Sequence, residues 1–340
     1  MNTTSSGGTC AGLFDTTMKG KNMEISRKSN RRTFLKRVAS LTAIVSVSQW
    51  MKPFSGYITR MLPATADESR SLVVVKGSSM SKSGMEKMVQ KGLAQMGGLD
   101  RFVKRGMKVV VKPNLGFNSS PERAHTTHPY LVEAVAKMCK ALGADVKIMD
   151  RPVHNARLVY KTSGMVEAAD NAGVDLVYMD GRKYRRVDVP GGMNLRNLKV
   201  YSDILEADVI INMPIAKDHS SARLTLAMKN LMGVIGGNRG VYHLGLHKNI
   251  VDFTKTVPVQ LVILDATRVL VDHGPSSGRP SDIKHPKSIV LGTNPVAVDA
   301  YSSQTFFGIS PSRIDYLKYA SREGMGEINI RNMNVKRILV

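Results

Sequence analysis

Cysteine and acidic residues are scarce in this chain. Its 340 residues include 2 cysteines, and its 27 Asp and Glu face 49 Lys and Arg, which gives a formal net charge of +22. Cys10 lies in a predicted N-terminal leader, so Cys139 is the single cysteine of the region expected to fold. One cysteine excludes an internal disulfide and an all-cysteine zinc or iron–sulfur site there, and we expect no iron–sulfur cluster. The apolar helical pattern around Cys139 instead predicts a small core side chain.

The excess of positive charge favours anionic partners, such as phosphate and carboxylate ligands or acidic lipid surfaces. The sequence contains no recognised nucleic-acid-binding motif, so we expect no nucleic-acid partner. Long apolar runs are also lacking. The run at residues 38–50 is shorter than the ~20 residues that span a bilayer, and it contains Thr42, Ser46 and Gln49.

A twin-arginine export signal is predicted at the N-terminus. Residues 30–36, Asn-Arg-Arg-Thr-Phe-Leu-Lys, match the S/T-R-R-x-F-L-K pattern at every position but the first. The short apolar run follows, and Ala64-Thr65-Ala66 supplies an A-x-A cleavage site. We therefore expect residues 1–66 to be a signal peptide and flexible leader, and residues 67–340 to be the folded domain. The protein is then periplasmic or extracellular, its partner during export is the twin-arginine translocation machinery, and the membrane is a partner only if the leader stays uncleaved.

Strand and helix patterns alternate after the leader. Between residues 108 and 180 the order is strand, helix, strand, helix, strand, which is typical of half a Rossmann fold. The sequence therefore predicts an α/β protein with a layered Rossmann-like fold and a mostly parallel central sheet. The strands are expected at 72–76, 108–112, 145–150, 175–179, 208–213, 260–265 and 288–291. The helices are expected at 85–96, 129–142, 166–171, 222–232, 248–256, 296–305 and 313–323.

Three of these strands run into polar residues at their carboxyl ends. They are followed by Lys112 and Asn114, by Asn212, Lys217 and His219, and by Asp265. In open α/β sheets the ligand crevice lies beyond the carboxyl ends of the strands, so we expect one composite site there. Asn and Pro also form ordinary turns, and an Asp can cap a loop, so a structural role stays open for these residues.

Short motifs near these strand ends resemble the family called domain of unknown function 362 (DUF 362), over about residues 70–310. The motifs lie at residues 111–115, 212–219, 224–233, 262–266 and 294–300. The resemblance implies the same α/β fold. Many members of the family carry a ferredoxin-like segment and are described as iron–sulfur related, but this chain lacks the cysteine set, so that property is not carried over.

The predicted helix at 222–232 carries an unusual set of polar residues. Thr225, Lys229 and Met232 are spaced to share one helix face, and Lys229 and Asn230 interrupt an otherwise apolar stretch. Lys229 must either reach solvent or meet a counter-charge. Together with Lys112 and Lys217 it would place three ammonium groups at one crevice, which suits a phosphate or polycarboxylate ligand. A lysine with a lowered pKa also serves as a base or a Schiff-base nucleophile, and the sequence does not separate these roles.

A divalent metal is a further hypothesis. His243 and His247 are four residues apart, and His219, Asp265 or Asp299 would complete a set of three. Gly240 and Gly245 argue against a regular helix between them. The glycine-rich segment at 233–240 is expected to form a mobile flap, with Arg239 as its contact to an anion.

Two functions are compatible with these features, and a membrane-tethered structural protein is a third possibility that requires the leader to stay uncleaved. The first is an exported enzyme that acts on a small anionic molecule. The second is a non-catalytic protein that binds an anion or cofactor, or that assists assembly of an exported redox complex. Candidate catalytic residues are Lys112, Lys217, His219 and Asp265. Candidate ligand-binding residues are Asn114, Asn212, Thr225, Lys229, Asn230 and Arg239. Candidate metal ligands are His219, His243 and His247.

Overall fold

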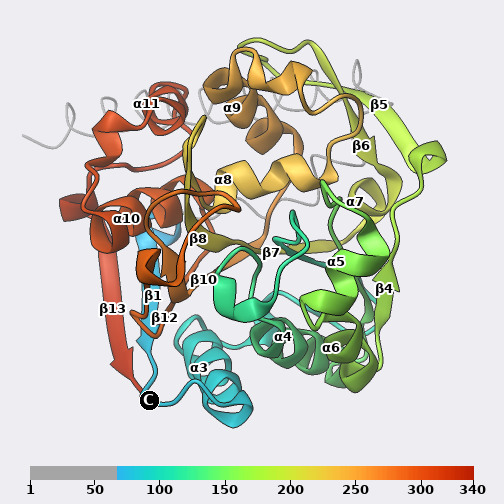
Figure 1. Ribbon diagram of the computed structural model, residues 1–340, viewed down its shortest axis with the longest axis vertical. Helices are drawn as coiled ribbons and strands as arrows, with labels where there is room; N and C mark the ends of the chain where they lie inside the picture. Colours follow the sequence, from blue (N-terminus) through green and yellow to red (C-terminus); the bar gives the residue numbers. More distant parts are fainter. Residues whose placement is uncertain (1–66) are drawn as a thin grey trace, which may run out of the picture. The chain divides into compact units, whose positions relative to one another are not determined.

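The computed structural model describes residues 67–340 (Figure 1). The predicted export signal and cleavage site, residues 30–66, lie outside the described part. An 11-stranded sheet forms the centre of the domain, with its main path in the order β13-β1-β12-β10-β7-β2-β3-β4. The strands on this path are β1 (Ser71–Lys76), β2 (Lys108–Pro113), β3 (Asp145–Met149), β4 (Asp175–Val177), β7 (Val209–Met213), β10 (Leu261–Leu270), β12 (Ser288–Gly292) and β13 (Asn334–Leu339).

The expected mostly parallel sheet is confirmed. Strands β4, β3, β2, β7 and β10 pair in parallel in that order, and β12 runs antiparallel between β10 and β1. Counted from β2, this is the 3-2-1-4-5 strand order of a Rossmann fold, and the order reverses between β2 and β7. The chain therefore has its topological switch point beside the polar ends of these two strands.

Helices cover both faces of the sheet (Figure 1). One face packs against α3 (Lys82–Gln95), α4 (Pro129–Ala141), α5 (Ala156–Thr162) and α6 (Met165–Ala172). The other packs against α7 (Ser202–Glu206), α8 (Ala227–Asn230), α9 (Leu246–Thr256), α10 (Pro295–Phe307) and α11 (Asp315–Arg322).

Alternate residues of β2 belong to opposite apolar cores. Val109 and Val111 face the α3–α6 layer, whereas Val110 faces the α7–α11 layer. Val110, Ile210 and Ile263 are each at most 2% exposed. This two-sided burial explains why these strands are continuous apolar runs.

Several elements differ from the expectations. The prediction of one helix over residues 222–232 is wrong. Its first part is strand β9 (Arg223–Thr225), which pairs antiparallel with β8 (Ile215–His219). The short helix α8 follows this strand. The sequence analysis also missed α5, α7, β11 (Ile283–Lys284) and β13, as well as the hairpin of β5 (Tyr184–Asp188) and β6 (Asn197–Tyr201). Between residues 67 and 340, no helix is long and apolar enough to cross a membrane.

Candidate functional site

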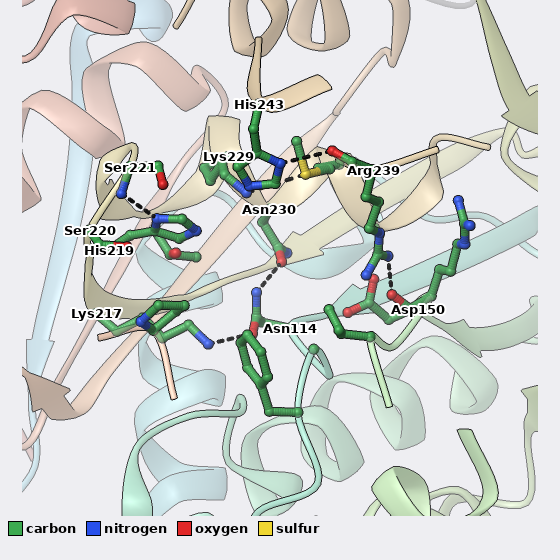
Figure 2. Close-up of a pocket in the computed structure, with 18 residues that line it drawn as sticks. Asn114, Asp150, Lys217, His219, Ser220, Ser221, Lys229, Asn230, Arg239 and His243 are labelled. Carbon is green, nitrogen blue, oxygen red and sulfur yellow. Dashed lines mark hydrogen bonds between the residues drawn. The ribbon is translucent and has the colours of Figure 1, made fainter. Parts of the chain in front are cut away.

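A pocket of about 340 Å³ lies beyond the carboxyl ends of β2 and β3, beside the strand β8 that continues from β7. Figure 2 shows its polar side chains, which come from the loop after β2, from β8, from α8 and from the segment after α8. The predicted residues that line it are Asn114, Lys217, His219, Thr225, Lys229, Asn230, Arg239 and His243. Lys112, Asn212, Asp265 and His247 do not line it.

Lys217 enters the pocket from β8 and is 1% exposed. Its Nζ donates to the Asn114 Oδ1 at 3.1 Å and to the backbone carbonyl of His125 at 2.6 Å. The Phe117 ring lies beside the amine, with the ring centroid 5.0 Å from Nζ. Burial, followed by repulsion from Lys229, lowers the pKa of Lys217 to about 7. A substantial fraction of this amine is therefore uncharged at neutral pH.

Three asparagines form a chain of hydrogen bonds that ends at Lys217. Asn212 Nδ2 donates to the backbone carbonyl of Ala227 at 2.9 Å, and Asn230 Nδ2 donates to Asn212 Oδ1 at 2.8 Å. Asn114 Nδ2 then donates to Asn230 Oδ1 at 2.9 Å, as Figure 2 shows. The Ala227 carbonyl can only accept a hydrogen bond, so the Asn212 amide must present its N–H₂ group to it. Each following amide then has one permitted orientation. This series of hydrogen bonds therefore fixes the Asn114 oxygen toward Lys217. Asn212 does not line the pocket and acts on it through Asn230.

Lys229 and Arg239 add positive charge on the opposite side of the pocket from Lys217 (Figure 2). The Lys229 Nζ contacts the Met232 Sδ at 3.3 Å. Burial, with Arg239 and Lys112 as further causes, lowers the pKa of Lys229 to about 8. Arg239 donates to the backbone carbonyl of Arg151, and burial likewise lowers its pKa.

A buried ion pair lies beneath this cationic surface. Lys112 is fully buried, and its Nζ lies 2.9 Å from Asp150 Oδ1. The other oxygen, Asp150 Oδ2, accepts from the backbone N–H of Leu115 at 2.6 Å. Asp150 is the only acid among the described residues that line the pocket, and Lys112 already compensates its charge.

His219 is an uncharged hydrogen-bond donor toward the pocket. Its Nδ1 accepts from the backbone N–H groups of Ser221 and Ala222 at 3.2 and 3.3 Å, so the ring proton is on Nε2. Burial, followed by repulsion from Lys229 and Lys217, lowers the pKa of His219 to about 3. This ring is therefore a poor proton acceptor, in contrast to a catalytic base.

The three predicted metal ligands do not converge. The His219 and His243 rings are stacked with centroids 6.4 Å apart, but His247 stacks on Tyr316 and does not line the pocket. Gly245 has a φ of +73° and precedes the first residue of α9, so no regular helix runs from His243 to His247, as the two glycines predict. Within residues 67–340, no group of three or more His, Cys, Asp or Glu is placed to hold a metal ion.

The placement of Asp265 differs from the expectation. Its carboxylate is fully buried and lies 3.2 Å from the Arg268 guanidinium. It also accepts from the Thr267 hydroxyl at 2.6 Å and from the backbone N–H of His128 at 2.9 Å. These contacts give Asp265 a structural role in the middle of β10, which continues to Leu270 and does not end at Asp265 as expected, and they place it outside the pocket. The prediction that Thr225, Lys229 and Met232 share one helix face is also wrong, because Thr225 belongs to strand β9.

Three residues that the sequence analysis gave no role contribute to the site. Asp150, Arg151 and Phe117 line the pocket. Asp150 and Arg151 follow β3 directly, so the strand-end criterion that identified Lys112 also applies to them. Phe117 lies in a loop without a periodic pattern, and no sequence signal marked it.

Comparison with known proteins gives the following matches. A sequence profile described as "Domain of unknown function (DUF362)" matches residues 109–304, a range that contains every residue lining the pocket. A thylakoid-associated protein of Synechocystis sp. is 26% identical over 223 residues, which cover 63% of this chain and 68% of that protein.

Two solved structures are distantly similar. The lactate racemase apoprotein from Thermoanaerobacterium thermosaccharolyticum has 13% identity and a TM-score of 0.36, over 68% of this chain and 56% of that one. A Thermotoga maritima protein has 11% identity and a TM-score of 0.36, over 56% of this chain and 51% of that one. The matched part spans about half the length of each.

Proposed function

The chain belongs to the DUF362 family, and from the chemistry of its pocket we propose that it is an enzyme acting on a small anionic molecule. In this proposal Lys229 and Arg239 bind the anionic group, and the uncharged amine of Lys217 performs the chemistry as a base or a nucleophile. The family match covers every residue that lines the pocket.

The observation that carries the proposal is the burial of two lysines without a carboxylate hydrogen-bonded to either amine. Lys217 and Lys229 are 1% and 8% exposed, and their described partners are carbonyl oxygens and a thioether, not carboxylates. A buried ammonium without a paired carboxylate is costly, so an anion in the pocket would stabilise the charged form of Lys229, whereas Lys217 avoids the same cost by losing its proton. The pocket volume of about 340 Å³ suits a small metabolite.

Lys217 is the group best suited to chemistry. General bases are most effective when their pKa lies near the working pH, and the pKa of Lys217 is about 7. His219 Nε2–H, two residues along the same strand, is a donor available to an oxygen of the bound molecule. A donor and an uncharged amine on the same side of one strand are a suitable pair for proton transfer.

A non-catalytic anion-binding or cofactor-binding protein, including an assembly protein for an exported redox complex, is the second candidate. The position of Asp265 outside the pocket favours it, because the lysines alone suffice to bind an anion. We further propose that either activity takes place in the periplasm or outside the cell, after export by the twin-arginine machinery. That part of the proposal is supported by residues 30–36 and 64–66.

Calorimetric titration with inorganic phosphate and with pyruvate tests the anion site. We expect Lys229→Ala to weaken binding of the anion by about tenfold or more, since a hydrogen bond to a charged group contributes about 1.5–3 kcal/mol. Lys91→Ala, at an exposed position on α3, is the matched control and should bind normally. Equal binding by wild type and Lys229→Ala would contradict the proposal. Binding without turnover of any small anion in a metabolite screen would favour the non-catalytic candidate.

A further inference from the structure

We infer that Lys217 is a nucleophile that forms an imine with a carbonyl compound carrying a carboxylate or phosphate group. This inference rests on the proposed anion site and names the substrate class for it. It is carried by the arrangement of hydrogen bonds around the amine, by the burial of that amine and by the cations that line the same pocket.

The hydrogen bonds of Lys217 match an uncharged amine. Such an amine has two N–H donors and one lone pair, whereas an ammonium has three donors and no lone pair. The two acceptors, Asn114 Oδ1 at 3.1 Å and the His125 carbonyl at 2.6 Å, use two N–H groups. When the amine is uncharged, both of its N–H groups are therefore used and only its lone pair is left without a partner among these contacts. Lys217 also lines the pocket. The lone pair is thus available to a bound molecule.

The asparagine chain keeps this arrangement in place. Asn114 would present an N–H₂ group to Lys217 if its amide were reversed, and a donor facing a donor would disrupt the contact. The reversal is prevented because Asn230 offers an oxygen to the Asn114 Nδ2, and Asn212 in turn orients Asn230. The chain is anchored on the Ala227 carbonyl. Asn114, Asn212 and Asn230 are therefore positioning residues for the amine.

The other buried lysines of the site are less suited to this step. Lys112 is held in an ion pair with Asp150, and its second contact is the Pro113 carbonyl at 2.9 Å. A carboxylate 2.9 Å away favours the charged, non-nucleophilic form. Lys229 is positioned against a thioether, and in the proposed function its charge binds the anion. Each lysine thus has a different environment, and Lys217 has the one that favours nucleophilic attack.

The surroundings specify what kind of carbonyl compound fits. Lys229 and Arg239 would bind a carboxylate or a phosphate, and both groups are recognised by the same cations. Phe117 and Met232 supply apolar surface for a short carbon chain. His219 Nε2–H is a donor for the carbonyl oxygen under attack. The smallest molecules with these features are 2-oxo acids and phosphorylated ketones.

The step is balanced without another reactant. The Lys217 lone pair attacks the carbonyl carbon, a C–N bond forms, and the carbonyl oxygen takes up a proton released from the nitrogen. The resulting carbinolamine loses its hydroxyl as water with a second proton, and the C=N bond forms. One amine and one carbonyl give one imine and one water, with no change of oxidation state.

Reductive trapping tests the inference. The purified protein is incubated separately with pyruvate, dihydroxyacetone phosphate and acetone, treated with sodium borohydride, digested, and analysed by peptide mass spectrometry. We expect a reduced adduct on Lys217 with one or both anionic probes, at a level at least tenfold above acetone. The two anionic arms distinguish a carboxylate from a phosphate ligand. Labelling should rise as pH increases from 6 to 8, and inorganic phosphate should compete with it.

Two variants accompany the wild type. Lys217→Arg keeps a long nitrogen-bearing side chain but has no nucleophilic amine, so the adduct on this peptide should be lost. Asn114→Ala keeps the amine but removes an acceptor that favours its protonated form, so labelling should begin at lower pH and stay on Lys217. The phosphate competition uses wild type only, so the test does not depend on either variant folding.

Each result has one reading. Adducts scattered over surface lysines, or equal labelling by acetone, would overturn the inference. Calorimetric binding of phosphate without an adduct on Lys217 would overturn the imine but leave the anion site standing. Absence of both binding and labelling would overturn the inference and the proposed function together.

Discussion

At the scale of single residues, three buried lysines within one site differ in what they contact. Lys112 faces a carboxylate, Lys217 faces two carbonyl oxygens, and Lys229 faces a thioether. Desolvation disfavours the charged form of all three, and only Lys112 has an ion pair in compensation. The amino-acid sequence identifies the three lysines but not this difference, because each partner comes from another part of the chain.

The lowered pKa of Lys217 predicts a dependence of stability on pH. An unfolded chain titrates Lys near 10.4, so between pH 8 and 10 the unfolded state binds more protons than the folded state. The free energy of unfolding should then rise with pH, by up to about 1.4 kcal/mol per pH unit for one fully displaced proton. Burial raises the pKa of Asp299 to about 8, so below pH 8 the folded state binds the extra proton at this residue. Asp299 therefore makes the free energy of unfolding fall with rising pH, but mainly below the range from pH 8 to 10.

Urea denaturation of the wild type and of Lys217→Met at pH 8, 9 and 10 measures this effect. The variant should lose the part of the slope that Lys217 contributes, while Lys91→Met at an exposed position should keep the full slope. Identical slopes for the wild type and Lys217→Met would mean that Lys217 is charged in the folded protein throughout this range.

Gly233 is predicted to be intolerant of any side chain. A Cβ at this position would overlap Asp150 Oδ1 and lie 2.8 Å from the Lys112 Nζ. Gly233→Ala should therefore separate the buried ion pair and destabilise the protein by about 3–5 kcal/mol. Gly181→Ala is the control, because a Cβ there meets nothing within 4 Å. Thermal denaturation of the two variants gives the comparison, and a Gly233→Ala protein as stable as Gly181→Ala would refute the prediction.

At the scale of elements, the sequence predicts the strands well and the segment after β7 poorly. The Val-rich run of β2 and the apolar runs of β7 and β10 are buried on both faces, so composition alone identifies them. Residues 224–230 are also buried, and this short segment holds the end of a hairpin strand and then a short helix. Local pattern cannot separate these alternatives, since the strand β9 is fixed by its pairing with Lys217–His219.

The asparagine chain shows why part of the site is beyond sequence analysis. Asn114 and Asn230 are 116 residues apart in the chain, and Lys217 and Asn114 are 103 apart. Strand ends indicate that these residues gather at one edge of the sheet. The orientation of each amide depends on its neighbour in space, so no spacing in the sequence specifies it.

Helix α8 is predicted to depend on a carboxylate from another helix. Asp299 of α10 accepts from the backbone N–H groups of Ala227 and Met228 at 2.6 and 3.0 Å, and it is fully buried. Asp299→Ala would leave both groups unsatisfied at the start of α8, which carries Lys229 and Asn230. We expect a loss of about 2 kcal/mol in the free energy of unfolding and weaker binding of phosphate.

Asp315→Ala is the matched control for this carboxylate. Asp315 is in the first turn of α11, half exposed, and pairs with Lys318 at 2.7 Å. Its loss should cost less than about 1 kcal/mol. Chemical denaturation and phosphate titration of both variants test the prediction, which fails if Asp299→Ala binds phosphate as wild type does.

At the scale of the whole domain, strands outside the family match complete the sheet. The match ends at residue 304, whereas β13 pairs in parallel with all of β1 from Ser71 to Lys76. Removing residues 334–340 would expose the edge of β1, whose Leu72–Val75 run is buried. We expect a melting temperature lower by about 5 °C or more and a tendency to aggregate. Lys336→Ala, an exposed β13 position that keeps the ladder, should change neither, and a soluble truncated protein of unchanged melting temperature would contradict the prediction.

Export is predicted for the whole chain, with cleavage after Ala66. Cleavage there would leave the first described contacts intact, because β1 begins at Ser71 and the Ser71 hydroxyl donates to the Asp67 carbonyl at 2.8 Å. Replacing Arg31 and Arg32 by Lys keeps the charge but removes the guanidinium groups, and the two side chains are not interchangeable where planar groups are recognised. The double variant should accumulate in the cytoplasm as an uncleaved precursor, whereas Arg27→Lys should be exported normally. Cell fractionation with N-terminal sequencing makes the measurement, and mature double variant in the periplasm would show that this segment is not an export signal.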